Sequence, residues 1–305
     1  MIAFKNIDFK NFSHEESFFI FCSGYETRSL AILKECLSKK LIPINNVMAF
    51  VFNDYSSSDT GTSNYIYIKQ NDVPYEVIKA NQFHKILETI YKENSCGKVV
   101  SIDYSSMPRI IYLEIAQFAI QNKIRINFWY SEGNYSNDIS HCSTSGINDF
   151  EIFSGAPSLK PNNTRTHIFN IGFNWRRSSA LNILFDPERL YISIAGKSRD
   201  HNVVAAVLKA NHDLDVSAKY KFILPVDDFT EMISRLNELC MQLRSDGDVI
   251  LIPDGPKPAI LAYSILPFLI DQNGVVCYTL VSSKSITKID ISATGKVYGV
   301  EMSHE

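Results

Sequence analysis

Short apolar runs alternate with amphipathic segments along the whole chain. Each run has the length of a strand, and most are followed by a polar turn and then by a segment with apolar residues at helical spacing. The expected strands lie near 18–22, 47–52, 75–80, 99–102 and 124–130, and again near 168–171, 190–195, 220–225, 249–252 and 275–281. Strands that alternate with helices predict parallel sheets with right-handed crossovers. We therefore predict an α/β fold of two tandem Rossmann-like domains, each with a mostly parallel sheet.

The two halves also share sequence. The stretch 99–120 aligns without a gap on 249–270, at a constant offset of 150 residues. The identical pairs are Val99/Val249, Ile102/Ile252, Pro108/Pro258, Ile110/Ile260, Ile115/Ile265, Phe118/Phe268 and Ile120/Ile270. This agreement indicates an internal duplication. We expect an N-terminal repeat over 1–155, a linker over 156–166, where Pro, Asn and Ser occur without periodicity, and a C-terminal repeat over 167–305.

Composition narrows the functional class. The chain has 305 residues, of which 45% are hydrophobic and 21% charged, as in ordinary globular proteins of two domains. The formal net charge of −3 argues against a broad surface for duplex nucleic acid. Six scattered cysteines without a CxxC pair predict neither a zinc site nor a disulfide scaffold. With no signal-like N-terminus and no long apolar stretch, we expect a soluble cytoplasmic protein without metal or cofactor.

The turn after the first expected strand of each half is a candidate anion site. The first reads SGYETRS around Gly24 and Arg28, and the second reads GFNWRRS around Gly172 and Arg176 or Arg177. A glycine lets the backbone approach a ligand, a helix N-terminus favours an anion, and an arginine binds phosphate oxygens in a bidentate fashion. The alternative is that Arg28 pairs with Glu26 or another carboxylate.

The turns after the fourth expected strands, DYSSMPR and PDGPKP, are the second candidate. Their hydroxyls and charges suit a ribose and a phosphate, although Asp and Ser often only cap the next helix. The charged turn GKSRDHN adds Lys197, and a solvated loop is the alternative there. Trp129 and Trp175 are expected in the core or an interface. The full set of candidate ligand-binding residues is Gly24, Arg28, Ser105, Ser106, Arg109, Gly172, Arg176, Lys197 and Lys257.

Familiar catalytic motifs do not occur. The chain has no P-loop, no GxGxxG, no GxSxG and no HExxH. Three hypotheses remain open. The first is a module that binds a nucleotide-like anion and acts through a partner protein. The second is an enzyme acting on a nucleotide or nucleic-acid phosphate, with Asp103 or Asp254 as general acid or base. The third is a structural subunit of a larger assembly.

The paired turns and tandem Rossmann-like halves resemble the CARF and SAVED sensor domains of bacterial defence systems. In those families, two halves hold a cyclic or linear oligonucleotide messenger between them. The resemblance implies that polar turns of both halves face such a ligand, and that a separate effector chain responds. The residues it implies are Gly24, Arg28, Ser105, Ser106, Gly172, Arg176 and Lys257.

Overall fold

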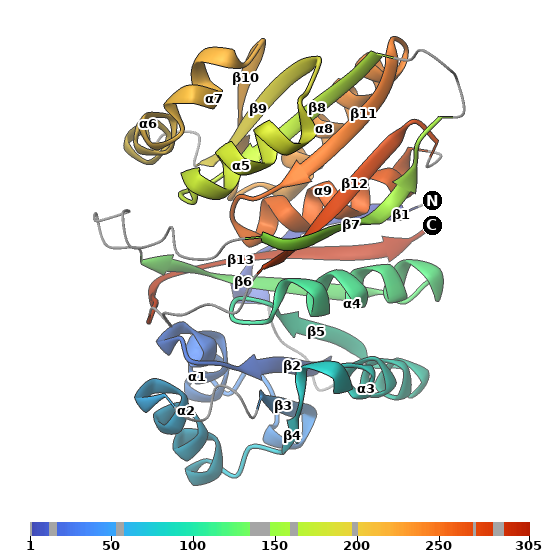
Figure 1. Ribbon diagram of the computed structural model, residues 1–305. Helices are drawn as coiled ribbons and strands as arrows, with labels where there is room; N and C mark the ends of the chain where they lie inside the picture. Colours follow the sequence, from blue (N-terminus) through green and yellow to red (C-terminus); the bar gives the residue numbers. More distant parts are fainter. Residues whose placement is uncertain are drawn as a thin grey trace. The chain divides into compact units, whose positions relative to one another are not determined.

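The computed structural model divides the chain into two compact units (Figure 1). Unit 1 comprises 1–136 and 288–305, and unit 2 comprises 137–287. The structure describes residues 2–11, 17–52, 58–134, 147–158, 164–196, 201–270, 273–282 and 290–305. Within these ranges no helix is long and apolar enough to cross a membrane.

In unit 1, the strands that the structure describes form one seven-stranded sheet, in the order β1-β13-β6-β5-β2-β3-β4. Its strands are β1 (Ile2–Ile7), β2 (Ser17–Ser23), β3 (Val47–Phe52), β4 (Tyr75–Ile78), β5 (Val99–Asp103), β6 (Ile126–Asn134) and β13 (Ser292–His304). Its helices are η1 (Phe9–Asn11), η2 (Thr27–Leu30), α1 (Ala31–Ser38), η3 (Ile44–Asn46), α2 (Asp59–Gln70), η5 (Ala80–Gln82), α3 (His84–Ser95) and α4 (Arg109–Gln121). The strands from β6 to β4 are parallel, and β13 pairs antiparallel with both β6 and β1.

Unit 2 has a six-stranded sheet of described strands in the order β10-β9-β8-β11-β12-β7. Its strands are β7 (Ile147–Ala156), β8 (Thr164–Ile171), β9 (Arg189–Gly196), β10 (Tyr220–Pro225), β11 (Gly247–Pro253) and β12 (Val275–Ser282). Its helices are α5 (Trp175–Phe185), α6 (His201–Ala210), α7 (His212–Ser217), α8 (Phe229–Arg244) and α9 (Lys257–Leu269). Five strands are parallel, and β7 pairs antiparallel with β12.

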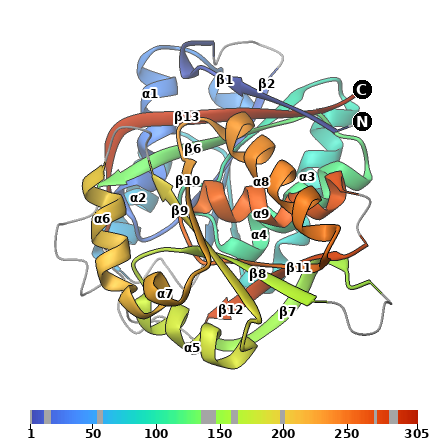
Figure 2. The same cartoon turned by 90° about the horizontal axis from the view of Figure 1, so that it is seen from above.

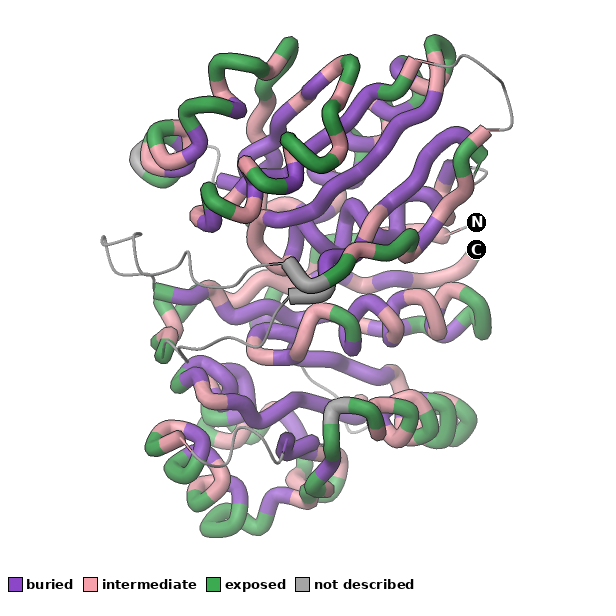
Figure 3. The backbone as a smooth tube through the Cα atoms, in the orientation of Figure 1, coloured by how far each residue is buried: buried purple, intermediate pink, exposed green. Residues whose placement is uncertain are grey.

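The two sheets repeat one strand order. In both, the first parallel strand is central, the second and third follow on one side, and the fourth and fifth on the other. This is the Rossmann-like order, so the predicted fold class is confirmed. The central strands β2, β5, β8 and β11 are almost wholly buried, whereas β1, β4 and β10 keep exposed residues (Figure 3). In unit 2, apolar residues of β8 and β9 form one core cluster with Leu181 of α5, Val207 of α6 and Leu214 of α7.

Local sequence explains where several helices begin. The Ser58 hydroxyl accepts a hydrogen bond from the Gly61 amide at the start of α2, and Asp228 accepts one from the Glu231 amide at the start of α8. Helix α9 is apolar on all sides and is buried over most of its length.

The division into units differs from the expected boundary at 156–166. Strand β7, expected to end the first repeat, pairs with β12 of unit 2. Strand β13, which ends the second repeat, instead pairs with β6 and β1 of unit 1, and both views show it beside β6 (Figure 1, Figure 2). Each repeat therefore contributes its last antiparallel strand to the sheet of the other.

Candidate functional site

Each unit brings together the two turns that the sequence singled out. Strands β2 and β5 are parallel neighbours in unit 1, and β8 and β11 are parallel neighbours in unit 2. From the first strand of each pair the chain continues to one side of the sheet, and from the second it continues to the other. The turns after these strands therefore lie at a topological switch point, where open α/β sheets bind ligands. We call the paired turns 24–28 and 103–106 the switch point of unit 1, and 172–177 and 254–257 the switch point of unit 2.

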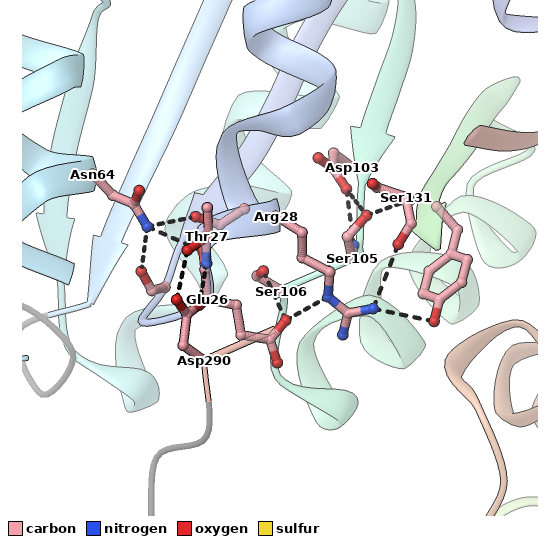
Figure 4. Close-up of polar contacts among 12 residues, drawn as sticks. Glu26, Thr27, Arg28, Asn64, Asp103, Ser105, Ser106, Ser131 and Asp290 are labelled. Atoms are coloured by element: carbon pink, nitrogen blue, oxygen red, sulfur yellow. Dashed lines mark hydrogen bonds and ion pairs between the residues drawn. The ribbon is translucent and has the colours of Figure 1, made fainter. Parts of the chain in front are cut away.

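Arg28 is the centre of a buried network in unit 1 (Figure 4). Its Nε donates to Glu26 Oε2 at 2.6 Å, and one terminal nitrogen donates to the Tyr130 hydroxyl at 3.2 Å and the Ser131 carbonyl at 3.4 Å. Its guanidinium also lies over the Tyr130 ring, 5.6 Å from the centroid. The Arg28 side chain is only 3% exposed. The alternative interpretation of this arginine, an ion pair with Glu26, is therefore confirmed.

The turn after β5 is held by its own polar groups. Asp103 Oδ1 accepts hydrogen bonds from the Ser105 amide at 2.9 Å and the Ser105 hydroxyl at 2.5 Å. The Ser105 hydroxyl in turn accepts one from the Ser131 amide at 2.7 Å. Ser106 is half-buried, and its hydroxyl donates to Glu26 Oε2 at 3.3 Å, which joins this turn to the turn after β2. Asp103 and Ser105 are thus structural groups of the turn, fully or almost fully buried.

The turn after β2 is also fastened by a residue distant in sequence. Asp290 accepts hydrogen bonds from the Thr27 amide and the Thr27 hydroxyl, both at 2.6 Å, and the Arg28 amide donates to the Ile291 carbonyl at 3.1 Å. A carboxylate beside the first amides of a helical turn is electrostatically favourable. Asp290 therefore places a carboxylate of the chain itself beside this turn, where the sequence predicted an external anion.

In unit 2 the ion pair joins the two turns directly. Arg177 Nε donates to Asp254 Oδ2 at 2.8 Å, and its Nη2 donates to Asp254 Oδ1, so the contact is bidentate. The side chains are 10% and 3% exposed, respectively. Asn174 caps α5 by accepting a hydrogen bond from the Arg177 amide. Gly172 is required for this approach, because a Cβ there would lie 2.9 Å from the Asp254 carbonyl oxygen.

Two asparagines that the sequence did not single out support the switch points in the same way. In unit 1, Asn64 of α2 donates from its amide nitrogen to the Gly24 carbonyl at 3.0 Å. In unit 2, Asn211 after α6 donates to the Gly172 carbonyl at 2.9 Å. Both asparagines are buried, and each fixes the glycine that follows the first parallel strand. Asn64 lies 40 residues after Gly24, and Asn211 lies 39 residues after Gly172.

The remaining candidates occupy different environments. Arg109 and Lys257 are the first residues of α4 and α9 and are half-buried. Arg176 is exposed, with its guanidinium 5.3 Å from the centroid of the exposed Trp175 ring, so Arg177 rather than Arg176 contacts the second turn. Lys197 lies outside the described residues. Trp129 is a core residue as predicted, whereas Trp175 is 41% exposed.

The two switch points differ in charge. In unit 1 the carboxylates are Glu26, Asp103 and Asp290, and the cations are Arg28 and Arg109. In unit 2 the turns hold one carboxylate, Asp254, against Arg177, Lys257 and the outward-facing Arg176. The described residues contain no group of three or more His, Cys, Asp or Glu side chains arranged to hold a metal ion. The sequence matches no protein-family model and no curated protein.

Proposed function

We propose that the protein binds a phosphate-bearing, nucleotide-like ligand at the switch point of unit 2 and passes this event to a partner protein. The observation that carries the proposal is the excess of positive charge at this switch point, beside a glycine turn and the start of α5. An anion placed there meets Arg177, Lys257 and the positive end of a helix. At the switch point of unit 1 the same anion meets three carboxylates.

The Arg177–Asp254 pair supports this assignment. Its bidentate geometry fixes the guanidinium before any ligand arrives, so a ligand does not have to order that side chain. The pair is neutral as a whole, and Lys257 at the start of α9 adds a basic side chain beside the two turns. A phosphate is the common biological anion that suits this combination of lysine, arginine and backbone amides.

A binding role fits the two acidic residues better than catalysis does. Asp103 holds the Ser105 amide and hydroxyl, and Asp254 holds Arg177. Both carboxylates are therefore engaged in maintaining their turns. A sensing role is also what the resemblance to CARF and SAVED domains implies, and the response then passes to a separate effector chain.

The test is calorimetric titration of the full chain with a panel of mono-, di- and oligonucleotides. We expect Lys257→Ala to weaken binding about tenfold, the equivalent of ~1.4 kcal/mol. Lys219→Ala is the matched control, because Lys219 is exposed and donates its amide to Leu190 at the opposite, amino end of the strands.

Ser106→Ala assigns the binding unit, since Ser106 belongs to the switch point of unit 1. Binding that is lost in Ser106→Ala and retained in Lys257→Ala would move the site to unit 1 and contradict the proposal. Absence of binding by the wild type to every member of the panel would also contradict it. Turnover of any nucleotide would replace sensing with the enzymatic alternative.

A further inference from the structure

The outer face of α5 carries the most exposed large apolar side chains among the described residues. Ile183 is 79% exposed and Leu184 57%, and Val216 of the neighbouring α7 is 71% exposed. Helices α5 and α7 contact each other, and they lie side by side in both views (Figure 1, Figure 2). Adjacent exposed apolar side chains of this kind mark interaction surfaces in soluble proteins.

The corresponding face of unit 1 does not show this feature. There, α1 and α2 occupy the positions after the first and second parallel strands. The lysine nitrogens of Lys34 and Lys69 lie over the rings of Tyr67 and Tyr65, at 4.7 and 4.4 Å from the centroids. Charged side chains thus cover the aromatic residues of that face. The apolar face of α5 is therefore particular to one copy of the duplication and is not a consequence of the shared fold.

The basic, small, apolar and acidic residues along α5 follow an order that lets the helix pair with an antiparallel copy of itself. Arg176 lies in the first turn, Ser179 and Ala180 in the middle, Ile183 and Leu184 in the last turn, and Asp186 and Glu188 just beyond it. Arg176, Asp186 and Glu188 are exposed and have no ion pair with any described residue. Basic and acidic groups that are unpaired at opposite ends of one helix can pair across a twofold axis.

We infer that the face of α5 formed by Arg176, Ala180, Ile183, Leu184 and Glu188 is a contact surface for a second copy of this chain. In an antiparallel pair of α5 helices, Ile183 and Leu184 of one copy pack over the small Ser179 and Ala180 of the other. Arg176 and Asp186 are ten residues apart, or about 15 Å along the helix. The same twofold arrangement therefore places Arg176 of each copy beside the acidic end of its partner.

The expected dimer is concentration-dependent. One helix with its neighbour on α7 is a small contact area, at the lower end of specific interfaces. The charges lie at the rim and set register and orientation more than affinity. The ligand and the dimer are tested with different variants, because Lys257 is not part of the α5 face and Ile183 is not part of the switch point of unit 2.

Sedimentation equilibrium of the full chain, from about 1 to 100 µM, tests the inference over the range expected for a contact of this size. We expect the wild type to dimerise with rising concentration, and Ile183→Glu to remain monomeric throughout. Met241→Glu is the matched control, because Met241 is another exposed apolar residue, at 52%, on α8 of the same unit. It should dimerise like the wild type, and Ile183→Glu should bind nucleotide as well as the wild type does.

Charge reversal tests the antiparallel register. Arg176→Glu and Glu188→Arg should each weaken the dimer, and the double variant should restore it. A wild type that is monomeric at 100 µM, or unchanged association in Ile183→Glu, would overturn the inference. Failure of the double variant to recover association would overturn the pairing. If the wild type is monomeric and Ile183→Glu lowers the unfolding midpoint while Met241→Glu does not, another part of the same chain covers this face, and the inference is wrong.

Discussion

Replacing Glu26 with glutamine should destabilise unit 1 strongly. The substitution keeps the side-chain shape but removes the negative charge, and the Arg28 guanidinium is only 3% exposed. Two further acceptors of this guanidinium, the Tyr130 hydroxyl at 3.2 Å and the Ser131 carbonyl at 3.4 Å, are neutral and at long hydrogen-bond distances. Removing one partner of a buried ion pair costs roughly 3–5 kcal/mol, because the remaining charge is left uncompensated. For a unit of about 150 residues, a loss of that size lowers the melting temperature by roughly 10 °C.

The assay is urea denaturation followed by tryptophan fluorescence in a Trp175→Phe background. Trp129 is then the only tryptophan, and it is buried in the core of unit 1. The matched control is Glu35→Gln, which breaks the Glu35–Lys39 pair on the surface of α1, where the side chains are 33% and 56% exposed. An exposed pair of this type contributes about 0.3–0.5 kcal/mol.

A second variant separates lost charge balance from lost shape. Combining Glu26→Gln with Arg28→Met removes the buried cation as well, so part of the stability should return. If Glu26→Gln costs no more than Glu35→Gln, or if the double variant is less stable than the sum of the two single variants, the network around Arg28 does not stabilise unit 1 as described.

Three further predictions concern the rest of the fold. Gly299→Ala should cost about 1–3 kcal/mol by overpacking, because its Cβ would lie 2.3 Å from the Trp129 ring, and urea titration against exposed Lys296→Ala measures this. A chain ending at residue 287 lacks β13 between β1 and β6, so limited proteolysis should digest unit 1 and leave a resistant fragment of unit 2. Burial, helped by the positive charge of Arg165, lowers the pKa of His167 from 6.5 to about 4. Between pH 6.5 and about pH 4, the unfolded chain binds a proton at His167 that the folded chain does not bind. Lowering the pH through this window should therefore reduce the free energy of unfolding by up to ~1.4 kcal/mol per pH unit. Calorimetry at several pH values should show that His167→Phe removes this slope.

The pattern of apolar runs predicted the parallel part of both sheets, because buried parallel strands are nearly continuous apolar segments. The expected run 18–22 lies within β2, and 275–281 lies within β12. The exchange of β7 and β13 was not predictable in this way. Both are antiparallel strands that follow the fifth parallel strand of a repeat, and either sheet offers each of them an edge to pair with. Which sheet receives them depends on contacts distant in sequence, which local periodicity does not report.

At the switch points, local contacts were predictable and distant ones were not. Glu26 and Arg28 are two residues apart, so their pairing was a natural alternative from the start. Asp290 is 263 residues from Thr27, and nothing in either turn indicates that contact. The choice between Arg176 and Arg177 depends on the helix start, because successive residues of an α-helix point about 100° apart. With α5 beginning at Trp175, Arg177 faces Asp254 and Arg176 faces outward.

One position at which the two units differ is the second residue after the glycine of the first turn. Glu26 follows Gly24 by two residues, and Asn174 follows Gly172 by two. In unit 1 the glutamate neutralises the arginine of its own turn, and Asp103 is then engaged by Ser105. In unit 2 the neutral asparagine caps the helix instead, so the arginine reaches across to Asp254 and joins both turns. Each copy thus keeps a buried arginine–carboxylate pair. In unit 2 this pair includes the one carboxylate of the two turns, Asp254, whereas in unit 1 Asp103 is not part of the pair. Asp290 beside the turn of unit 1 and Lys257 in the turn of unit 2 add to this difference in charge between the two switch points.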